Sequence, residues 1–131
     1  MPATFRISHL IDAEKQRLII TVRGRYESTA LIDALIKLYG TLGHPWLYDR
    51  IMDMRSADGY VEVLDLLRAG KYLAEMAGSP PPPRKRLALI STDPFDRPRL
   101  GSMEDMFPKA FIQTFESLDE ALDWLDTVPA V

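Results

Sequence analysis

The chain of 131 residues contains no cysteine, which excludes disulfides, thiolate metal sites and cysteine nucleophiles. It also lacks long apolar runs, since none approaches the ~20 residues that a membrane-spanning helix needs. The N-terminal sequence MPATFRISHL does not have the charged-then-apolar pattern of a signal peptide. We therefore expect a cytoplasmic protein without a transmembrane segment.

Groups of chemically reactive residues are also missing. The two histidines, His9 and His44, are far apart and have no carboxylate at ligand spacing. Asp49 and Asp53 project to the same side of an expected strand, which suits a metal ion, but we expect one of them to lie at the strand end and to be solvated. No nucleophile with a positioned base is visible, so we expect no enzyme, no metal and no cofactor.

The charge balance limits the partners. The net charge is −3 and the pI is about 5.3, so the chain as a whole does not attract phosphate backbones. We expect no nucleic-acid partner.

The length suits one ordinary hydrophobic core, and we expect a single domain over residues 1–131. Alternating polar and apolar residues predict strands over 4–8 and 17–22, joined by the turn DAEKQ. Further strands are expected at 46–54, 86–92 and 110–115. The segment RLALIST (86–92) is a continuous apolar run, which is typical of a strand covered on both faces, and we expect it at the centre of the sheet.

Apolar residues at helical spacing predict about four helices. The first begins near Ser28, and its inner face consists of Leu31, Leu35, Leu38, Tyr39 and Leu42. The second runs from about Tyr60 to Ala77, with an inner face of Val63, Leu67, Gly70, Ala74 and Ala77, where Gly70 marks close packing. A weaker third helix passes through Leu100, Met103, Met106 and Phe107. The last follows Ser117, which forms a capping box with Glu120.

This order of elements predicts an α/β fold: a mixed, mostly parallel sheet of about five strands, flanked by about four helices. The N-terminal hairpin strand is expected to be antiparallel. The proline-rich segment 79–86 connects the second helix to the RLALIST strand, because successive prolines cannot continue a helix. We expect its basic residues, Arg84-Lys85-Arg86, to be exposed at the end of the sheet opposite the candidate site.

The layout as a whole, the segment IMDMRSADGYVEVLDLL, the RLALIST strand and the terminal FESLDEALDWL resemble the small single-domain SpoIIAA-like proteins of the STAS group. This bacterial family is also compared with lipid-carrying SEC14-type domains. The resemblance implies a SpoIIAA-like fold and a non-enzymatic regulatory or protein-interaction function. In the anti-sigma-factor antagonists of this group, a phosphorylated serine follows the third strand in an Asp-Ser-Ser-Gly-like sequence. The matching residues here are Ala57-Asp58-Gly59, with Ser56 two residues early, so the signature is not reproduced.

The carboxyl ends of parallel strands meet at one edge of a sheet, where ligands of open α/β folds usually bind. By that rule we expect a candidate interaction or anion-binding edge formed by Arg55, Ser56, Asp58, Gly59, Ser91, Thr92, Asp93 and Arg97, joined by Arg99 and residues 25–28. Either Ser56 takes a phosphate beside Arg55, or Asp58 supplies a fixed negative charge. The alternative is that Asp58 or Ser56 merely caps the following helix. Arg55 is expected to serve binding and to contribute little to folding.

A second function stays open, because flexible apolar residues gather in the second half of the chain. They are Met52, Met54, Phe95, Met103, Met106, Phe107 and Phe111. We expect them to fill the core, but under a weakly patterned helix at 97–107 they would also admit a small apolar ligand or lipid, as in SEC14-type domains. The sequence leaves open the protein partner and whether the chain forms a homodimer.

Overall fold

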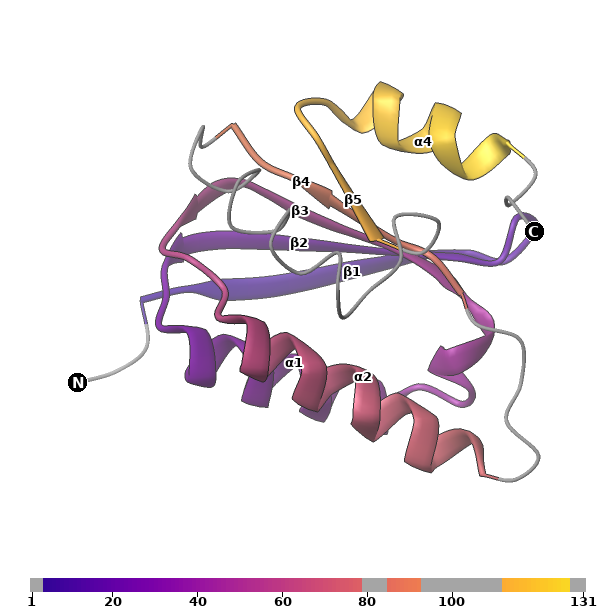
Figure 1. Ribbon diagram of the computed structural model, residues 1–131, viewed down its shortest axis with the longest axis horizontal. Helices are drawn as coiled ribbons and strands as arrows, with labels where there is room; N and C mark the ends of the chain where they lie inside the picture. The colour runs from indigo at the N-terminus through magenta and orange to yellow at the C-terminus, as the bar shows by residue number, and fades with distance from the viewer. Residues whose placement is uncertain (1–3, 79–84, 93–111, 128–131) are drawn as a thin grey trace.

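The structure is a computed structural model that describes residues 4–78, 85–92 and 112–127. A five-stranded mixed sheet forms its centre (Figure 1). In chain order the elements are β1 (Arg6–Asp12), β2 (Arg17–Arg25), α1 (Ser28–Thr41), the short 3₁₀ helix η1 (Pro45–Leu47), β3 (Asp49–Asp58), α2 (Val63–Ala77), β4 (Leu87–Ile90), β5 (Ile112–Phe115) and α4 (Leu118–Asp126). No helix within these described ranges is both long and apolar enough to span a bilayer.

The sheet has the order β1-β2-β3-β4-β5, in which β1 is antiparallel to β2 and all other neighbours are parallel. The predicted antiparallel hairpin and mostly parallel sheet are therefore confirmed. The prediction that RLALIST is the central strand is wrong, because β3 lies at the centre and β4 beside it. All four residues of β4 are buried, so its coverage on both faces is confirmed.

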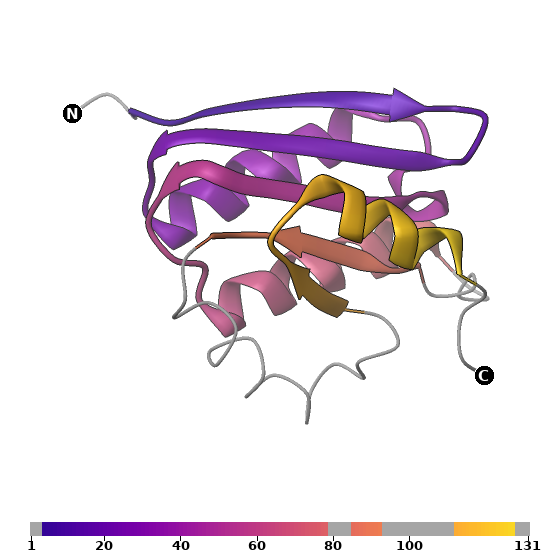
Figure 2. The same ribbon diagram turned by 90° about the horizontal axis from the view of Figure 1, so that it is seen from above.

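Helices cover both faces of the sheet. Helices α1 and α2 lie on one face and α4 lies on the other (Figures 1 and 2). The first layer buries alternate β2 residues, Leu18, Ile20 and Val22, against α1 and α2. The second buries Ile51, Ala88 and Ile90 under Ala121 and Leu125 of α4. Burying such side chains stabilises the fold by about 25 cal/mol per Å² of apolar surface removed from water.

The described residues contain three α-helices where the sequence predicts about four. The expected helix through Leu100 and Phe107 lies outside the described residues. The first helix is confirmed. The cap at Ser117 is confirmed in one direction, because its hydroxyl accepts the backbone N–H of Glu120 at 3.2 Å.

The inner face of α2 differs from the prediction. The helix buries Leu66, Ala69 and Leu73, because this stripe carries larger side chains than the one through Leu67 and Ala74. At Gly70 an added Cβ would meet nothing within 4 Å, so this glycine does not mark close packing.

Strand β3 is longer than predicted and contains a bulge. Thr21 pairs with Asp53, and the next pair in the register is Arg23 with Ser56. Two steps along β2 therefore correspond to three steps along β3, so β3 has one extra residue. The carboxylate of Asp53 accepts the backbone N–H of Arg55 at 3.1 Å, which occupies a donor near the point where the ladder is interrupted. The predicted end of this strand at residue 54 is therefore wrong: polar residues such as RSAD suit a loop, but here their backbone still pairs with the end of β2.

Strand β2 is longer than predicted as well. Gly24 does not end it, since pairing continues to Arg25. This glycine has φ +95°, and a side chain there would collide with the carbonyl oxygen of Thr4. The two long strands carry their charged ends beyond β4.

Candidate functional site

The tip of the sheet at the carboxyl ends of β2 and β3 carries an exposed pair of charges. Arg25 lies opposite Asp58, and the backbone N–H of Tyr26 donates to the carbonyl oxygen of Asp58 at 3.0 Å. The side chains form an ion pair of 3.5 Å and are 82% and 78% exposed. Such a pair adds little to stability, so both charges stay available to a partner.

Gly59 turns the chain from β3 toward α2. Its φ is +148°, and an added Cβ would lie 2.7 Å from the carbonyl oxygen of Tyr26 and 3.0 Å from its ring. Tyr26 belongs to the core. The Asp-Gly sequence is thus explained by a close approach of two backbone segments.

The start of α2 is held by α1. The N-cap residue of α2 is Glu62, which accepts no cap bond through its own side chain. The backbone N–H of Glu62 instead donates to the Ser28 hydroxyl at 2.8 Å. The interpretation of Asp58 or Ser56 as the cap is therefore wrong, because α2 begins beyond their reach. Arg68 of α2 also binds Asp33 of α1, at 2.7 Å.

Arg55 is part of the bulge and binds Asp53 through two bonds. Its Nε donates to Oδ1 at 2.9 Å and its Nη2 to Oδ2 at 2.7 Å. The hydrogen bond from Arg55 lowers the pKa of Asp53, and the same contact raises the pKa of Arg55. The charge of Arg23 also lowers the pKa of Asp53, and the charge of Asp119 also raises the pKa of Arg55. The expectation that Arg55 contributes little to folding does not fit this geometry.

The other predicted site residues divide between the two sides of β3. Ser56 is exposed and pairs with Arg23 of β2. On the β5 side, Ser91 follows the last residue of β4, its backbone N–H donating to the carbonyl oxygen of Phe115 at 2.9 Å, and Thr92 is exposed. Asp93, Arg97 and Arg99 lie outside the described residues.

Two exposed apolar side chains that the sequence interpretation did not select follow this tip in the chain. Tyr60 is 50% exposed in the connection after Gly59, and Leu64 is 76% exposed in the first turn of α2. Leu64 belongs neither to the predicted inner face of α2 nor to the buried one. A leucine outside the apolar face of a helix was the signal in the sequence that could have indicated an exposed apolar residue. We name the residues Arg25, Ser56, Asp58, Tyr60 and Leu64 the carboxyl-end surface.

Comparison with known proteins connects this geometry to a fold. No family model and no curated protein sequence matches the chain. Among solved structures, an anti-sigma factor antagonist from Mycobacterium paratuberculosis has a TM-score of 0.56 at 17% identity, with 93% of this chain and 96% of that chain covered. An uncharacterised protein from Shewanella loihica, described as having a SpoIIAA-like fold, has a TM-score of 0.57 at 19% identity, with 95% and 98% covered. The antagonist SpoIIAA in its unphosphorylated form has a TM-score of 0.50 at 15% identity, with 95% and 99% covered.

The chain has a SpoIIAA-like fold. The SpoIIAA-like fold that the resemblance implies is confirmed. Within this fold the carboxyl-end surface lies on the connection between β3 and α2.

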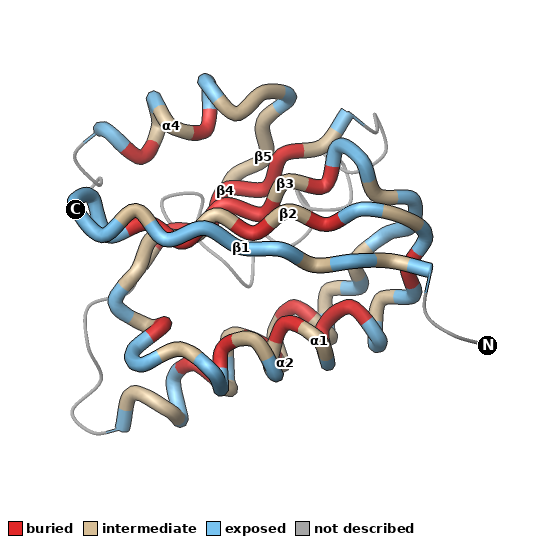
Figure 3. Tube along the Cα trace, turned by 180° about the vertical axis from the view of Figure 1, so that it is seen from behind, coloured by how far each residue is buried: buried red, intermediate tan, exposed pale blue. Residues whose placement is uncertain are grey.

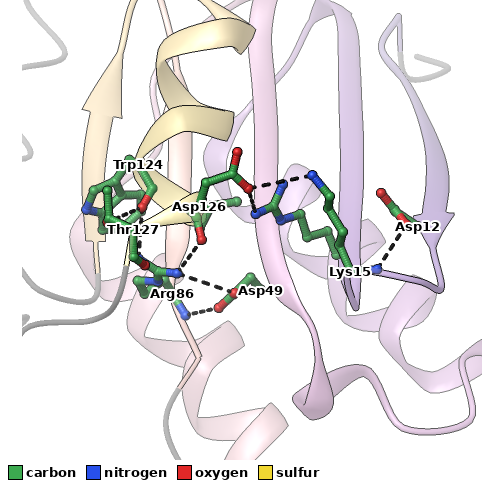
Figure 4. Close-up of polar contacts among 9 residues, drawn as sticks. Asp12, Lys15, Asp49, Arg86, Trp124, Asp126 and Thr127 are labelled. Carbon is green, nitrogen blue, oxygen red and sulfur yellow. Dashed lines mark hydrogen bonds and ion pairs between the residues drawn. The ribbon is translucent and has the colours of Figure 1, made fainter.

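The opposite, amino end of the SpoIIAA-like sheet holds a buried cation. Arg86 donates to the carbonyl oxygens of Leu125 at 2.7 Å, Trp124 at 3.0 Å and Thr127 at 3.1 Å (Figure 4). Its guanidinium lies 5.2 Å from the centre of the Trp124 ring and 3.8 Å from Asp49. The predicted exposure of Arg86 is wrong, because the last carbonyls of α4 need donors and the negative end of the helix attracts a cation.

A second arginine at the amino end is also engaged. The buried Arg17 donates to Asp126 at 2.6 Å, and Lys15 lies 3.7 Å from the same carboxylate. These contacts lower the pKa of Asp126, with the Arg17 hydrogen bond as the largest cause. Together with Arg86, they fix the end of α4 to the sheet.

Two of the three aspartates of β3, Asp49 and Asp53, bind protein groups. Asp49 accepts the backbone N–H of Arg86 at 2.9 Å, and Asp53 binds Arg55. Within the part of the chain that the structure describes, no three side chains gather as metal ligands.

The methionine and phenylalanine cluster is described only in part. Met52 and Met54 belong to the buried core with α1 and α2. The other members, Phe95, Met103, Met106, Phe107 and Phe111, lie outside the described residues.

Proposed function

We propose that this protein is a non-enzymatic regulatory domain that binds a protein partner through the carboxyl-end surface. The observation that carries the proposal is the exposure of Tyr60 and Leu64 in the segment that follows the exposed Arg25–Asp58 pair. Two of its structural neighbours are anti-sigma factor antagonists, which supports a regulatory function in this fold.

The chemistry of this surface suits a protein partner. Protein interfaces commonly place an aromatic or aliphatic anchor at the centre and charged residues at the rim. Tyr60 and Leu64 provide the anchors, and Arg25 and Asp58 provide the rim. A small polar ligand would need convergent polar groups in a concave site, whereas these side chains are exposed.

The surface is also held in place before any partner binds. Gly59 packs against Tyr26, and the Ser28 hydroxyl fixes the start of α2 at Glu62. A preformed surface loses less conformational entropy on binding, so a few anchors suffice for affinity.

Phosphorylation of Ser56 is one way in which this surface could be regulated. Ser56 is exposed and lies opposite the exposed Arg23, so a phosphate there would have a cation across the strand pair. Arg55, by contrast, is already bound to Asp53. In the alternative, Asp58 supplies a permanent negative charge at the tip.

The apolar-ligand alternative gains no support from the described residues, since Met52 and Met54 are packed in the core. Their exposed fractions are 0% and 8%, which is typical of core residues.

The test is a pull-down from the native host with three baits: wild type, Leu64→Lys and Leu47→Lys. Leu47 is also an exposed leucine, but it lies in η1 at the amino end, so it is the matched control. We expect Leu64→Lys to lose partners that wild type and Leu47→Lys retain, with thermal melts confirming that all three baits are folded.

Mass spectrometry of the captured wild-type protein would detect phosphate on Ser56. If Leu64→Lys captures the same partners as wild type, the carboxyl-end surface is not the binding site. If no phosphate is found, regulation through Ser56 is excluded under those conditions while partner binding stands.

A further inference from the structure

Within the described part of the chain, strand β1 forms an open edge of the sheet. Among the described residues its only strand neighbour is β2, and five of its seven residues are exposed (Figure 3). Leu10 is 64% exposed and Ile11 is 36% exposed. Edge strands are usually protected by lysine, proline, a bulge or short length. Strand β1 contains neither residue, and its pairing with β2 is uninterrupted over seven residues.

The sequence of this strand, Arg6-Ile7-Ser8-His9-Leu10-Ile11-Asp12, is complementary to itself in the antiparallel direction. With His9 at the centre, Arg6 faces Asp12 and Ile7 faces Ile11. Ser8 then faces Leu10. A parallel in-register pairing would instead place Arg6 against Arg6 and Asp12 against Asp12, and like charges across strands are unfavourable.

We propose that β1 pairs antiparallel with β1 of a second copy of this chain, with the two-fold axis at His9. The two sheets would become one continuous sheet with the open edge removed from both copies. The pairing is isologous, so each contact occurs twice. This proposal is independent of the partner-binding function, because β1 contributes no residue to the carboxyl-end surface.

The alternation of side chains along a strand makes the contacts on both faces favourable. Ile7, His9 and Ile11 lie on the face of α1 and α2, where Ile7 already packs against the core. On the other face, Leu10 of each copy lies diagonally across from Leu10 of the other, within the reach of such side chains. The Arg6–Asp12 pairs form the two ends of this contact.

Charge and pattern both select this register. A shift of two residues in either direction breaks both ion pairs and leaves two residues of each strand unpaired. A single pair of seven-residue strands is small compared with stable interfaces, which bury about 1,200–2,000 Å². We therefore expect a dimer that forms in the micromolar to millimolar range of concentration and has a defined register.

The absence of cysteine allows a direct test of the register. In His9→Cys the two cysteines would face each other across the axis with Cα atoms about 4.5–5.5 Å apart, which suits a disulfide. In Ser8→Cys they would be diagonal and about 8 Å apart, beyond that range. With copper phenanthroline as oxidant, we expect at least tenfold faster dimer cross-linking for His9→Cys than for Ser8→Cys.

A mixture of Ser8→Cys and Leu10→Cys provides the second arm. These residues face each other in the proposed register, so the mixture should form a heterodimer faster than Ser8→Cys alone forms a homodimer. Equal cross-linking of His9→Cys and Ser8→Cys, or none, would overturn the proposal.

Sedimentation equilibrium of the unmodified chain tests the assembly itself. We expect a monomer–dimer equilibrium that weakens about tenfold in Leu10→Lys and not in the control Leu47→Lys, since lysine on an edge strand opposes pairing. A monomer at all concentrations, or equal weakening in the two variants, would contradict a dimer through β1.

Discussion

The two ends of the sheet carry the same residue types in opposite environments. At the amino end, Arg86 is 5% exposed and donates to three carbonyl oxygens at the end of α4. At the carboxyl end, the side chain of Arg25 is 82% exposed and has one long ion pair, to Asp58. The sequence around Arg86 and around Arg25 does not distinguish the two environments. In the structure, only the guanidinium of Arg86 donates hydrogen bonds to backbone carbonyl groups.

This difference separates stability from binding. A buried cation that satisfies several carbonyl groups is costly to remove, because those groups then lack donors. An exposed cation costs little to remove and remains free to meet a partner. The amino end therefore holds α4 to the sheet, and the carboxyl end presents charge and apolar surface.

The largest expected effect is that of Arg86→Met, for which Arg25→Met is the matched control. We expect Arg86→Met to lower the free energy of unfolding by about 3 kcal/mol. The carbonyl groups of Leu125 and Thr127 lose their guanidinium donor, and Asp49 loses the cation beside it. Arg25→Met should change it by about 0.5 kcal/mol or less. Urea denaturation of the three proteins measures both, and similar losses in the two variants would remove the distinction between the ends.

A smaller effect is expected at the bulge, where Arg55 binds Asp53. Replacing Asp53 by Asn keeps an oxygen that can accept the Arg55 N–H but removes the charge, and should cost about 1 kcal/mol at pH 7. The hydrogen bond from Arg55 lowers the pKa of Asp53 below the usual value of an aspartate. Its contribution is therefore present above about pH 4 and is lost as the pH falls through the lower, folded pKa.

The pH dependence of this variant sharpens the test. The stability difference between wild type and Asp53→Asn should be largest at pH 7 and should shrink below pH 4, as measured by urea denaturation at several pH values. A difference that stays constant down to about pH 2 would show that the charge of Asp53 does not contribute.

The sequence predicted the architecture because its signals are local. The apolar alternation of β2 and the stripe of α1 each depend on residues within one element, and both are confirmed. The run Leu87–Ile90 correctly indicated a strand with both faces covered. Its position beside β3 depends on the order of all five strands, which no single segment encodes.

The site was predicted less well because its features depend on contacts between distant segments. Polar residues at 55–58 suggested a loop, but their backbone pairs with residues 23–25 of β2. The cap of α2 comes from Ser28, 34 positions before Glu62. Leu64 was not selected because helical periodicity identifies the apolar residues that face the core. An exposed apolar residue lies outside that pattern.

The central claim is that partners bind at the carboxyl end and that the amino end is structural. Hydrogen–deuterium exchange of the chain, alone and with its captured partner, tests this claim most directly. We expect new protection in residues 55–66, around Tyr60 and Leu64, with unchanged exchange in 85–90 and 118–127. New protection confined to the amino end, around Arg86 and α4, would contradict the account.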